Sequence, residues 1–405
     1  MKPENIAALI RGLNIDLTGK PQTVIFQEYS GETPNNAMKL ETSSGENEAS
    51  FALVIRNAYE NWKKSCSVIP EGGMVILPSC VSLTDNGKHA ALFWIDKDID
   101  SARKRLAEKD DSVRHESPIV KSAVINTAER ANIVKNRIAL VTGGAQGIGE
   151  EIVRNLTAAG ALVFIADLNI EGAQKLADII NTAEKRTAAL AVQVNVSSEE
   201  SVEAMFDKIA QITGGLDLCI SNAGVLKAGS VLEQELSDFK FVTDINYTGF
   251  FIISKYAGRL LRAQHYTSPD WSTDIIQINS KSGLEGSNKN GAYAGGKFGG
   301  LGLVASFAME LVEYGVKVNA VCPGNFLDGP LWSDPDRGLF VQYLKTGKVK
   351  GAKTINDVRS FYESKVPMKR GCTGKDLVRA IYYIVEQQYE TGQAVPVTGG
   401  QIMLH

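Results

Sequence analysis

The sequence is poor in cysteine, and its few cysteines are widely separated. Its 405 residues include five, and no two of them form a Cys-x-x-Cys pair. They are Cys66, Cys80, Cys219, Cys322 and Cys372. This spacing predicts no zinc or other metal site and argues against a disulfide framework, so we expect a reducing, cytoplasmic location.

An excess of charge of either sign is also missing. Lysine and arginine (43) nearly balance aspartate and glutamate (46), which leaves a formal net charge of −3. The chain therefore has no overall electrostatic attraction to nucleic acid or to an anionic membrane. It lacks an apolar run of membrane-spanning length, and residues 1–5 have no signal-peptide core. We expect neither nucleic acid nor a membrane as partner.

What the sequence does contain is a regular alternation of short apolar runs and helix-length segments from about Arg137 onward. The predicted strands are residues 138–142, 161–167, 188–194, 216–221, 274–279 and 317–322. Continuous apolar strands separated by helices indicate an α/β fold, a doubly wound parallel sheet covered on both faces. The length favours two domains.

The first 105 residues have a different pattern. Residues 23–27, 74–77 and 90–95 are predicted strands, and Phe51, Ile55, Ala58 and Trp62 fall on one face of a predicted helix, as expected for core packing. A charged stretch at 108–112 and a mixed segment to about 136 predict a linker or connecting helix. We expect a smaller α+β domain with its linker over residues 1–125 and a catalytic domain over residues 126–405. The sequence predicts no function for the first domain.

A glycine-rich turn follows the first predicted strand of the second domain. Residues 142–149 read Thr-Gly-Gly-Ala-Gln-Gly-Ile-Gly and lead into a predicted helix. Glycines allow a tight turn and a close approach to a pyrophosphate, whose charge the N–H groups at the start of the helix can meet. The spacing is GxxxGxG, not the more common GxGxxG. The expected dinucleotide contacts in this turn are Thr142, Gly143, Gln146, Gly147, Ile148 and Gly149.

The position of one aspartate predicts whether the enzyme prefers NAD or NADP. Asp167 ends the next apolar run, about 20 residues beyond the turn, as dinucleotide-binding folds require. Its carboxylate can accept hydrogen bonds from the adenosine ribose and would repel a 2′-phosphate. The turn contains no lysine or arginine to offset that repulsion. We therefore predict NAD as the cofactor.

A tyrosine and a lysine form the candidate catalytic pair. Lys297 follows Tyr293 by four residues, so both lie on one face if the segment is helical. A free tyrosine, with a pKa near 10, is a poor acid–base catalyst at neutral pH, and a neighbouring cation is expected to lower that pKa. Ser280, just after a predicted strand, could hydrogen-bond the substrate oxygen. The Tyr-x-x-x-Lys pattern alone is also common on solvated helix surfaces.

These motifs, with Asn222-Ala223-Gly224 after another strand and Asn246 in a helical stretch, resemble the classical short-chain dehydrogenase/reductase family. They occur in the family's order, and Pro323-Gly324 and two glycine-containing triplets at 391–393 and 398–400 also fit. The resemblance extends from about residue 136 to 405. It implies a Rossmann-type fold, an NAD-linked oxidoreductase and a homo-oligomer, either a dimer or a tetramer.

The resemblance also implies residue roles. Tyr293 would be the acid–base catalyst, Ser280 would orient the reacting oxygen, Lys297 would lower the tyrosine pKa and bind the nicotinamide ribose, and Asn246 would support a proton relay through water. The further implied cofactor contacts are Asn195, Val196, Asn222, Ala223, Gly224, Pro323 and Gly324. The sequence departs from the family pattern at Asn195, which stands where aspartate is frequent, and at residues 325–328, which lack the usual threonine.

Within this family, residues 275–283, 293–302 and 365–372 are similar to the bacterial sorbitol-6-phosphate 2-dehydrogenases. That similarity implies oxidation of a sugar-alcohol phosphate, sorbitol 6-phosphate, to fructose 6-phosphate. Lys227 and Lys281 are the candidate phosphate contacts, followed by Lys369, Arg370 and the lysine-rich residues 345–353.

Two other functions stay open. One is a short-chain dehydrogenase for a different alcohol, and the other is an NAD-binding regulatory or scaffolding protein that uses its N-terminal domain. Some sugar-phosphate dehydrogenases carry an aldolase domain in front, but His89 and His115 are isolated and do not form the close histidine pair that its metal needs.

Overall fold

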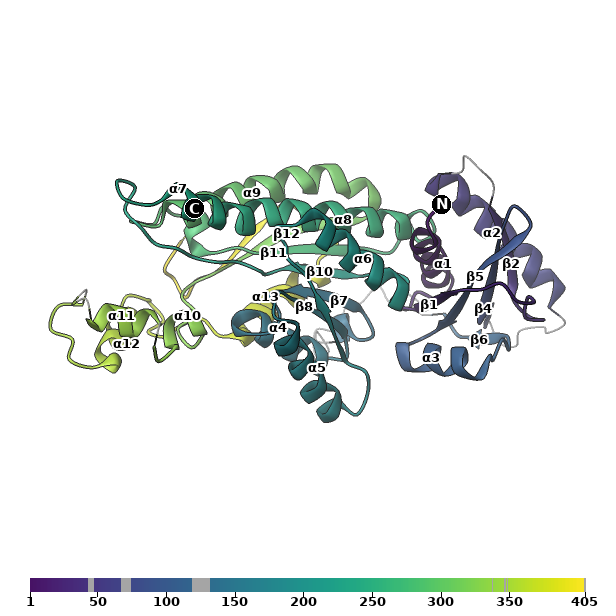
Figure 1. Ribbon diagram of the computed structural model, residues 1–405, viewed down its shortest axis with the longest axis horizontal. Helices are drawn as coiled ribbons and strands as arrows, with labels where there is room; N and C mark the ends of the chain where they lie inside the picture. The colour runs from purple at the N-terminus through teal and green to yellow at the C-terminus, as the bar shows by residue number, and fades with distance from the viewer. Residues whose placement is uncertain are drawn as a thin grey trace.

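A seven-stranded, wholly parallel sheet organises the larger part of the chain (Figure 1). The computed structural model describes residues 1–42, 47–66, 74–118, 132–336, 338–345, 347 and 349–403. The strands are β7 (Ile138–Thr142), β8 (Leu162–Asp167), β9 (Ala189–Gln193), β10 (Leu218–Ser221), β11 (Thr273–Ile278), β12 (Val316–Pro323) and β13 (Ala394–Val397). The six predicted strands are confirmed to within two residues at each end, whereas β13 was not predicted.

The strand order is β13-β12-β11-β10-β7-β8-β9, so the chain reverses direction across the sheet between β7 and β10. Ligands of open α/β sheets bind at the carboxyl ends of the strands beside such a reversal. The glycine-rich turn follows β7 and the Asn-Ala-Gly motif follows β10. The topology therefore brings these two motifs to the same place.

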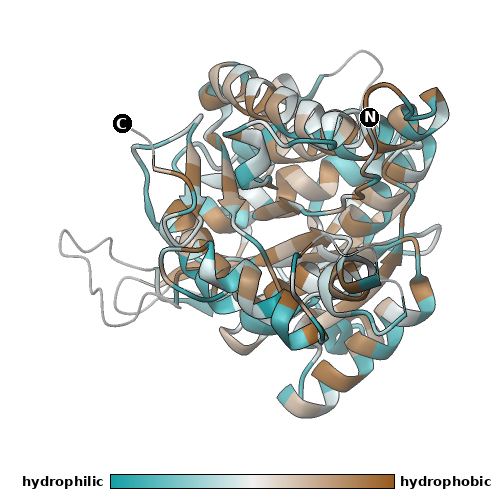
Figure 2. Ribbon diagram, turned by 90° about the vertical axis from the view of Figure 1, so that its left-hand side faces the viewer, coloured by the Kyte–Doolittle hydropathy of each residue, from teal (hydrophilic) through white to brown (hydrophobic). Residues whose placement is uncertain are grey.

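Helices cover both faces of this sheet, which confirms the doubly wound, Rossmann-type prediction (Figure 1). On one face lie α4 (Gly147–Ala158), α5 (Ile170–Glu184) and α13 (Gly374–Glu386); on the other lie α6 (Glu199–Thr213), α8 (Gly249–His265) and α9 (Gly291–Leu311). Along β7, Ile138 and Leu140 pack with the second set of helices, and Ala139 and Val141 pack with the first. Figure 2 shows apolar residues along the interior strands and helices that alternate between apolar and polar residues.

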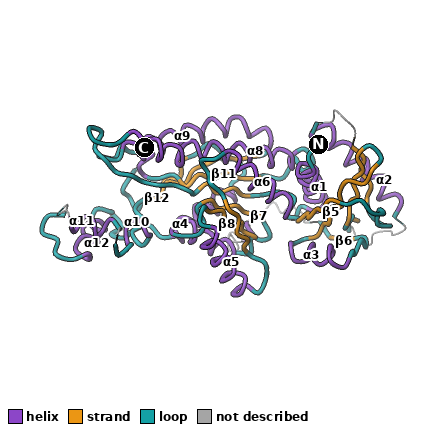
Figure 3. Tube along the Cα trace, in the orientation of Figure 1, coloured by secondary structure: helices purple, strands orange, loops and turns teal. Residues whose placement is uncertain are grey.

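The N-terminal segment is a separate α/β layer (Figure 3). Its four-stranded sheet has the order β1-β5-β4-β2, formed by β1 (Thr23–Glu28), β2 (Met38–Thr42), β4 (Cys80–Asp85) and β5 (Lys88–Asp96). A short pair, β3 (Val75–Leu77) and β6 (Arg114–Glu116), accompanies it, with helices α1 (Pro3–Thr18), α2 (Glu48–Ser65) and α3 (Ile99–Glu108). The three predicted strands are confirmed, and β2, β4 and β6 were not predicted. Phe51, Ile55 and Trp62 of α2 are buried in its core, as expected.

The two layers share buried apolar surface. Helix α1 packs against α8, and α6 packs against β1. Ala8, Ile25, Ile99 and Ala102 of the N-terminal segment belong to the same core cluster as the α6, α8 and α9 face of the large sheet. The predicted boundary at residue 125 lies outside the described residues, as do residues 119–131 of the predicted linker.

Three short helices form a projection beyond the carboxyl end of β12 (Figure 1). They are α10 (Pro330–Ser333), α11 (Leu339–Lys345) and α12 (Ile355–Ser364). A small core of their own, with Leu327, Trp332, Phe340, Val349 and Val358, holds them together. The remaining elements are α7 (Leu236–Thr243), the π-helical turn η2 (Asp244–Thr248) and the 3₁₀ turns η3 (Lys281–Gly283) and η4 (Val312–Tyr314).

The five cysteines are all described and none is bonded to another. The cytoplasmic location expected from their spacing stays a prediction. In the part of the chain that the structure describes, no helix is both long and apolar enough to cross a membrane.

Candidate active site

The turn between β7 and α4 has the shape that a pyrophosphate requires. Gly143 and Gly147 adopt left-handed backbone conformations, with φ of 61° and 60°. A Cβ atom on Gly149 would lie 2.0 Å from the Gly143 carbonyl oxygen, so a larger residue cannot occupy this position. Gln146 makes no side-chain cap on α4, which leaves the first N–H groups of the helix free for an anion. These residues fit a dinucleotide cofactor.

Thr142 and Asn222 fasten this turn to the end of β10. The Thr142 Oγ1 atom accepts hydrogen bonds from the backbone N–H groups of Asn222 and Ala223, both at 3.0 Å. In return, the Asn222 amide donates to the carbonyl oxygens of Thr142 (2.9 Å) and Gly143 (3.0 Å). The sequence predicted both residues as cofactor contacts. In the structure their side chains set the shape of the turn that would receive the cofactor.

Asp167 lies beside the same turn, as predicted. One carboxylate oxygen accepts from the backbone N–H of Ala145 and the other from Asn169, each at 3.0 Å. Each oxygen keeps lone-pair capacity for a further donor such as a ribose hydroxyl. The arrangement ties the carboxylate to the glycine-rich turn at the end of β8.

The family resemblance implies that Asn195 and Val196 lie at the adenine of the cofactor, and the structure arranges these two residues differently. Asn195 is exposed, and its side-chain oxygen accepts from the backbone N–H (3.1 Å) and hydroxyl (2.8 Å) of Ser197, so it shapes its own loop. Val196 is buried, and a Cβ on Gly249 at the start of α8 would lie 3.2 Å from it. Contact of Asn195 with an adenine stays a prediction.

Ser280, Tyr293 and Lys297 come together where β11 meets α9. Ser280 follows β11, and its side-chain oxygen accepts from the Ser282 N–H at 3.1 Å; it is close enough to Tyr293, on the first turn of α9, to influence the pKa of that tyrosine. The Lys297 ammonium group is buried and donates to the Ile278 carbonyl oxygen at 2.9 Å. It lies 5.6 Å from the centre of the Tyr293 ring. The predicted catalytic pair is therefore next to the predicted hydroxyl, at the carboxyl edge of the sheet.

The expected lowering of the tyrosine pKa is not what the structure gives. Burial raises the pKa of Tyr293 above its usual value, and the nearby Ser280 side chain only partly opposes this effect. Burial likewise lowers the pKa of Lys297, to about 8. The sequence prediction considered only the charge of the lysine, and it was wrong in direction because removal from water dominates both groups.

Asn246 lies in the π-helical turn η2 and holds the loop that follows the Asn-Ala-Gly motif. Its side-chain oxygen accepts from the Val225 N–H and its amide donates to the Val225 carbonyl oxygen, both at 2.8 Å. A Cβ on Gly224 would lie 3.2 Å from this oxygen and 3.8 Å from the Lys297 ammonium nitrogen. Asn246 and Lys297 therefore meet at Gly224, as the predicted site requires.

Two buried amides that sequence reasoning did not identify connect the catalytic elements. The Asn279 side chain donates to the Lys297 carbonyl oxygen (2.9 Å) and to Gln277 (2.7 Å), and it accepts from the Ser280 N–H (2.8 Å). Gly283 leaves room for this contact, because a Cβ there would lie 2.2 Å from the Asn279 oxygen. Asn279 thus positions Ser280 relative to α9. The sequence pattern that could have identified them is the presence of Gln277 and Asn279 in the predicted apolar strand 274–279, because buried amides need hydrogen-bond partners.

Pro323 and Gly324 end β12 close to the C-terminal loop. The Gly324 N–H donates to the Val397 carbonyl oxygen at 2.9 Å, and a Cβ on Gly324 would lie 2.5 Å from the Gln401 side chain. The departure at residues 325–328 has a structural counterpart: Leu327 is buried in the core of the projection, and Asp328 pairs with Arg359 of α12 at 2.6 Å. This segment therefore anchors the projecting helices.

The two candidate phosphate-binding lysines differ in their surroundings. Lys227 is exposed and pairs with Asp238 at 2.5 Å, with its ammonium group 5.0 Å from the Phe241 ring. Lys281 is partly buried in η3, beside α9, and its ammonium group has no ion-pair partner among the described residues. A phosphate would have to compete with Asp238 for Lys227 but not for Lys281.

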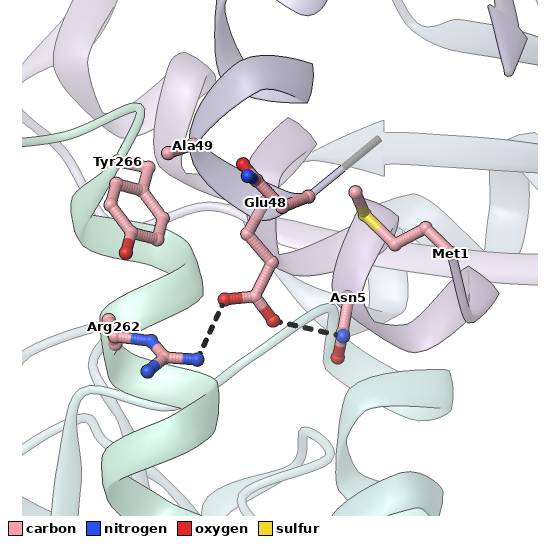
Figure 4. Close-up of a pocket in the computed structure, with 7 residues that line it drawn as sticks. Met1, Asn5, Glu48, Ala49, Arg262 and Tyr266 are labelled. Carbon is pink, nitrogen blue, oxygen red and sulfur yellow. Dashed lines mark hydrogen bonds and ion pairs between the residues drawn. The ribbon is translucent and has the colours of Figure 1, made fainter. Parts of the chain in front are cut away.

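A hollow at the junction of the two layers lies apart from these residues (Figure 4). Met1, Asn5, Glu48, Arg262 and Tyr266 are among the residues that line it. Figure 4 shows Glu48 between Arg262 and Asn5, to which it is bonded at 3.1 and 3.0 Å. The carboxylate and the guanidinium neutralise each other, so the hollow is part of the contact between α2 and α8.

Comparison with known proteins places this site among short-chain dehydrogenases. The family model described as "short chain dehydrogenase" matches residues 137–333. The chain is 34% identical over 270 residues to sorbitol-6-phosphate 2-dehydrogenase of Escherichia coli, a match that covers 66% of this chain and 99% of that protein. It is 29% identical to meso-2,3-butanediol dehydrogenase of Serratia marcescens, over 60% of this chain and 96% of that protein.

A solved structure agrees with these matches. The crystal structure of sorbitol-6-phosphate 2-dehydrogenase from Erwinia amylovora is similar, with a TM-score of 0.60 and 36% identity, over 66% of this chain and all of that one. About a third of the chain lies outside the matches to the two sorbitol-6-phosphate 2-dehydrogenases.

Proposed function

The chain belongs to the short-chain dehydrogenase family, and we propose that it is an NAD-dependent enzyme that interconverts a polyol phosphate and a ketose phosphate. The proposed pair is sorbitol 6-phosphate and fructose 6-phosphate. The observation that carries the proposal is that the buried Lys297 ammonium group lies 5.6 Å from the Tyr293 ring, with Ser280 nearby, at the edge of the sheet where the glycine-rich turn also lies.

In this proposal the side chains handle the proton and orient the alcohol. The Tyr293 oxygen takes the hydroxyl proton when the alcohol is oxidised and returns it when the ketone is reduced. Ser280 donates a hydrogen bond to the same substrate oxygen and fixes its position. When bound, NAD supplies the carbon that accepts the hydride from carbon 2.

The NAD preference in the proposal rests on Asp167. Its carboxylate is held next to the glycine-rich turn by the Ala145 N–H at 3.0 Å. A 2′-phosphate on the adenosine ribose would bring two more negative charges to this carboxylate. No lysine or arginine occurs in residues 142–149 or 167–169 to compensate.

The sugar-phosphate part of the proposal rests on similarity and on one lysine. The E. coli and Erwinia relatives are named as sorbitol-6-phosphate 2-dehydrogenases. Lys281, immediately after Ser280, offers a cation without an ion-pair partner among the described residues. Lysine serves a phosphate as a compact point charge.

We also propose that the enzyme is a homo-oligomer, a dimer or a tetramer. Phe251 on α8 and Phe298 and Met309 on α9 are large apolar side chains exposed on the outer face of these helices. Large apolar side chains exposed on two neighbouring helices suit a protein contact.

A second candidate function is oxidation of an unphosphorylated diol, which the similarity to meso-2,3-butanediol dehydrogenase supports. One screen distinguishes the candidates: the rate of NAD reduction over sugar alcohols and diols, each with and without a phosphate group. The proposal expects the highest kcat/KM with sorbitol 6-phosphate. A higher value for an unphosphorylated alcohol would favour the second candidate, and NAD binding without any turnover would favour a regulatory protein.

A further inference from the structure

Helix α9, which carries Tyr293 and Lys297, starts from an asparagine that does not cap it. Asparagine is favoured before a helix because its side-chain oxygen accepts a hydrogen bond from a backbone N–H in the first turn. Two other helices show this bond: Asn47 accepts from Ser50 at 2.9 Å at the start of α2, and Asn169 accepts from Gly172 at 3.0 Å at the start of α5. Asn290, before α9, makes no such bond.

The Asn290 side-chain oxygen is buried and has no hydrogen-bond partner among the described residues. The residue as a whole is only 9% exposed. Buried polar atoms in native proteins nearly always have a partner, so an exception calls for a ligand or another explanation. The contrast with Asn47 and Asn169 shows that the residue type is able to cap, but its oxygen is not used for that purpose here.

The position of Asn290 suggests which ligand this oxygen serves. Asn290 is the N-cap of α9, three residues before Tyr293 in the first turn of that helix. Its backbone pairs with Gly229, and the Gly229 N–H donates to the Lys289 carbonyl oxygen at 2.9 Å. Gly229 belongs to the loop that follows the Asn-Ala-Gly motif. Asn290 therefore lies between the loops that leave the carboxyl ends of β10 and β11, at the edge of the sheet where ligands bind.

The chemistry of the atom restricts the ligand further. An amide oxygen accepts hydrogen bonds and does not donate them, so it suits a hydroxyl group and disfavours a phosphate or carboxylate oxygen. The reacting hydroxyl of the substrate is assigned to Ser280 and Tyr293. A second hydroxyl on an adjacent carbon is therefore the donor that Asn290 can receive.

We propose that Asn290 determines specificity for a hydroxyl group next to the reacting carbon, through a hydrogen bond from that hydroxyl to its side-chain oxygen. This inference rests on the proposed function, in which the substrate is a polyol phosphate that reacts at carbon 2. The hydroxyl concerned is the one on carbon 1 or carbon 3. A buried acceptor left unpaired penalises any substrate without that hydroxyl.

The test compares sorbitol 6-phosphate with its 1-deoxy and 3-deoxy analogues. For the wild type we expect one analogue to lose about 10- to 100-fold in kcat/KM. In Asn290→Leu, which has a similar volume and no acceptor, that loss should shrink to less than about threefold, with KM for NAD unchanged. Asn290→Asp keeps an acceptor oxygen and should retain the preference. Asn290→Ala serves as a second variant if the leucine variant does not fold.

Thermal unfolding gives an independent readout. Asn47→Ala removes a formed cap and should lower Tm, whereas Asn290→Leu removes an unpaired buried oxygen and should leave Tm unchanged or raise it. A wild type that oxidises both deoxy analogues as well as sorbitol 6-phosphate would overturn the inference and leave the proposed function intact. If the wild type does not oxidise sorbitol 6-phosphate, the proposed function fails, and the alcohol that it does oxidise is compared with its own deoxy analogue. An equal preference in wild type and Asn290→Leu would also overturn the inference.

Discussion

Arg11 and Asp217 form an ion pair at 2.8 Å with both side chains completely buried, and this pair joins the N-terminal layer to the large sheet. Asp217 also accepts hydrogen bonds from the Ile138 N–H at the start of β7 (2.8 Å) and from the Trp271 ring (3.0 Å). Burial alone would raise the pKa of Asp217, but the nearby Arg11 and Arg137 hold it below its usual value. The two layers therefore depend on each other electrostatically as well as through packing.

The pair predicts that Arg11→Leu destabilises the protein strongly. The variant would leave Asp217 buried without its cation, which typically costs about 3–5 kcal/mol. Chemical denaturation measures the free energy of unfolding. Arg56→Leu, which breaks the partly exposed pair with Asp16 and a hydrogen bond to the Thr267 carbonyl oxygen, is the control and should cost less, about 1–2 kcal/mol. Equal stability of the Arg11 and Arg56 variants would contradict this account.

The contacts between the two layers also determine whether a shortened chain that starts at Asn132 can fold and remain active. If residues 1–125 formed an independent domain, such a chain would keep the NAD-linked reaction. The shared core and the buried Asp217 predict instead that it is insoluble or unfolded. Its solubility and circular dichroism distinguish the two outcomes.

Cofactor choice is predicted to depend on Asp167. In the wild type, kcat/KM with NAD should exceed that with NADP by at least about tenfold, or roughly 1.4 kcal/mol. Asp167→Ser should narrow the gap, because the charge that opposes a 2′-phosphate is removed. Asp178→Ala, on the outer part of α5, should leave the ratio unchanged. A wild-type enzyme with a higher kcat/KM for NADP than for NAD would contradict this prediction.

Lys297 predicts a pH-dependent stability difference. Burial lowers its pKa to about 8, whereas in the unfolded chain the amine titrates near its usual value of about 10.4. Below about pH 8 both states are charged and the folded state bears the full cost of a buried charge; between about pH 8 and 10 this cost disappears as the pH rises. The Lys297→Met variant has no charge at this position, so its folded state does not have this cost at any pH. The Tm of the variant relative to wild type should therefore fall between about pH 7 and pH 9.5.

Burial raises the pKa of Cys322, which lies near Lys297, to about 11, so this thiol stays protonated over this range in the folded state of both proteins and its contribution cancels in the difference. A difference in Tm that does not change with pH would show that Lys297 is not buried as a charge in the folded protein.

Lys281 is predicted to be the more important phosphate contact. Lys281→Met should raise KM for sorbitol 6-phosphate by about tenfold or more, because a charge-assisted hydrogen bond is lost. KM for NAD and any weak activity with sorbitol should hardly change. Lys227→Met, in which the lost cation was already paired with Asp238, is the matched comparison and should have a smaller effect.

If neither lysine variant changes KM, the phosphate is held elsewhere, and the other candidates differ in their surroundings. Lys369 donates to the Ser364 carbonyl oxygen, and Arg370 pairs with Asp376 at 2.6 Å. Parts of residues 345–353 lie outside the described residues.

The sequence predicts the large sheet well because its strands are buried on both faces and consist of continuous apolar runs. It does not predict β13 (Ala394–Val397), a four-residue edge strand that contains Pro396 and is only partly buried. In the N-terminal layer, β2 alternates between buried and exposed residues over just five positions, and β4 has Ser82 and Thr84 within it. Short strands that contain polar residues have neither a continuous apolar run nor a long enough alternation of apolar and polar residues to be predicted from the sequence.

The candidate site divides in the same way. Gly143, Tyr293 and Lys297 belong to motifs of fixed spacing, which the structure brings to the same edge of the sheet, and their roles stay predictions. Asn279 and Arg11 act through contacts with residues far away in the chain, which no local pattern encodes. The direction of the Tyr293 pKa shift could not be predicted from the sequence either, because it depends on the burial of the ring in the folded protein.

The most direct test of the account is NAD reduction with sorbitol 6-phosphate by the wild type and by Tyr293→Phe. The variant keeps the ring and loses only the oxygen that exchanges the proton, so turnover should fall on the order of 100- to 10,000-fold while NADH binding stays nearly intact. Tyr256→Phe, whose hydroxyl bonds Glu199 on the outside of the sheet, should keep the wild-type rate. The account predicts turnover of sorbitol 6-phosphate to fructose 6-phosphate that is lost only in Tyr293→Phe. A Tyr293→Phe enzyme with half of the wild-type rate would contradict it.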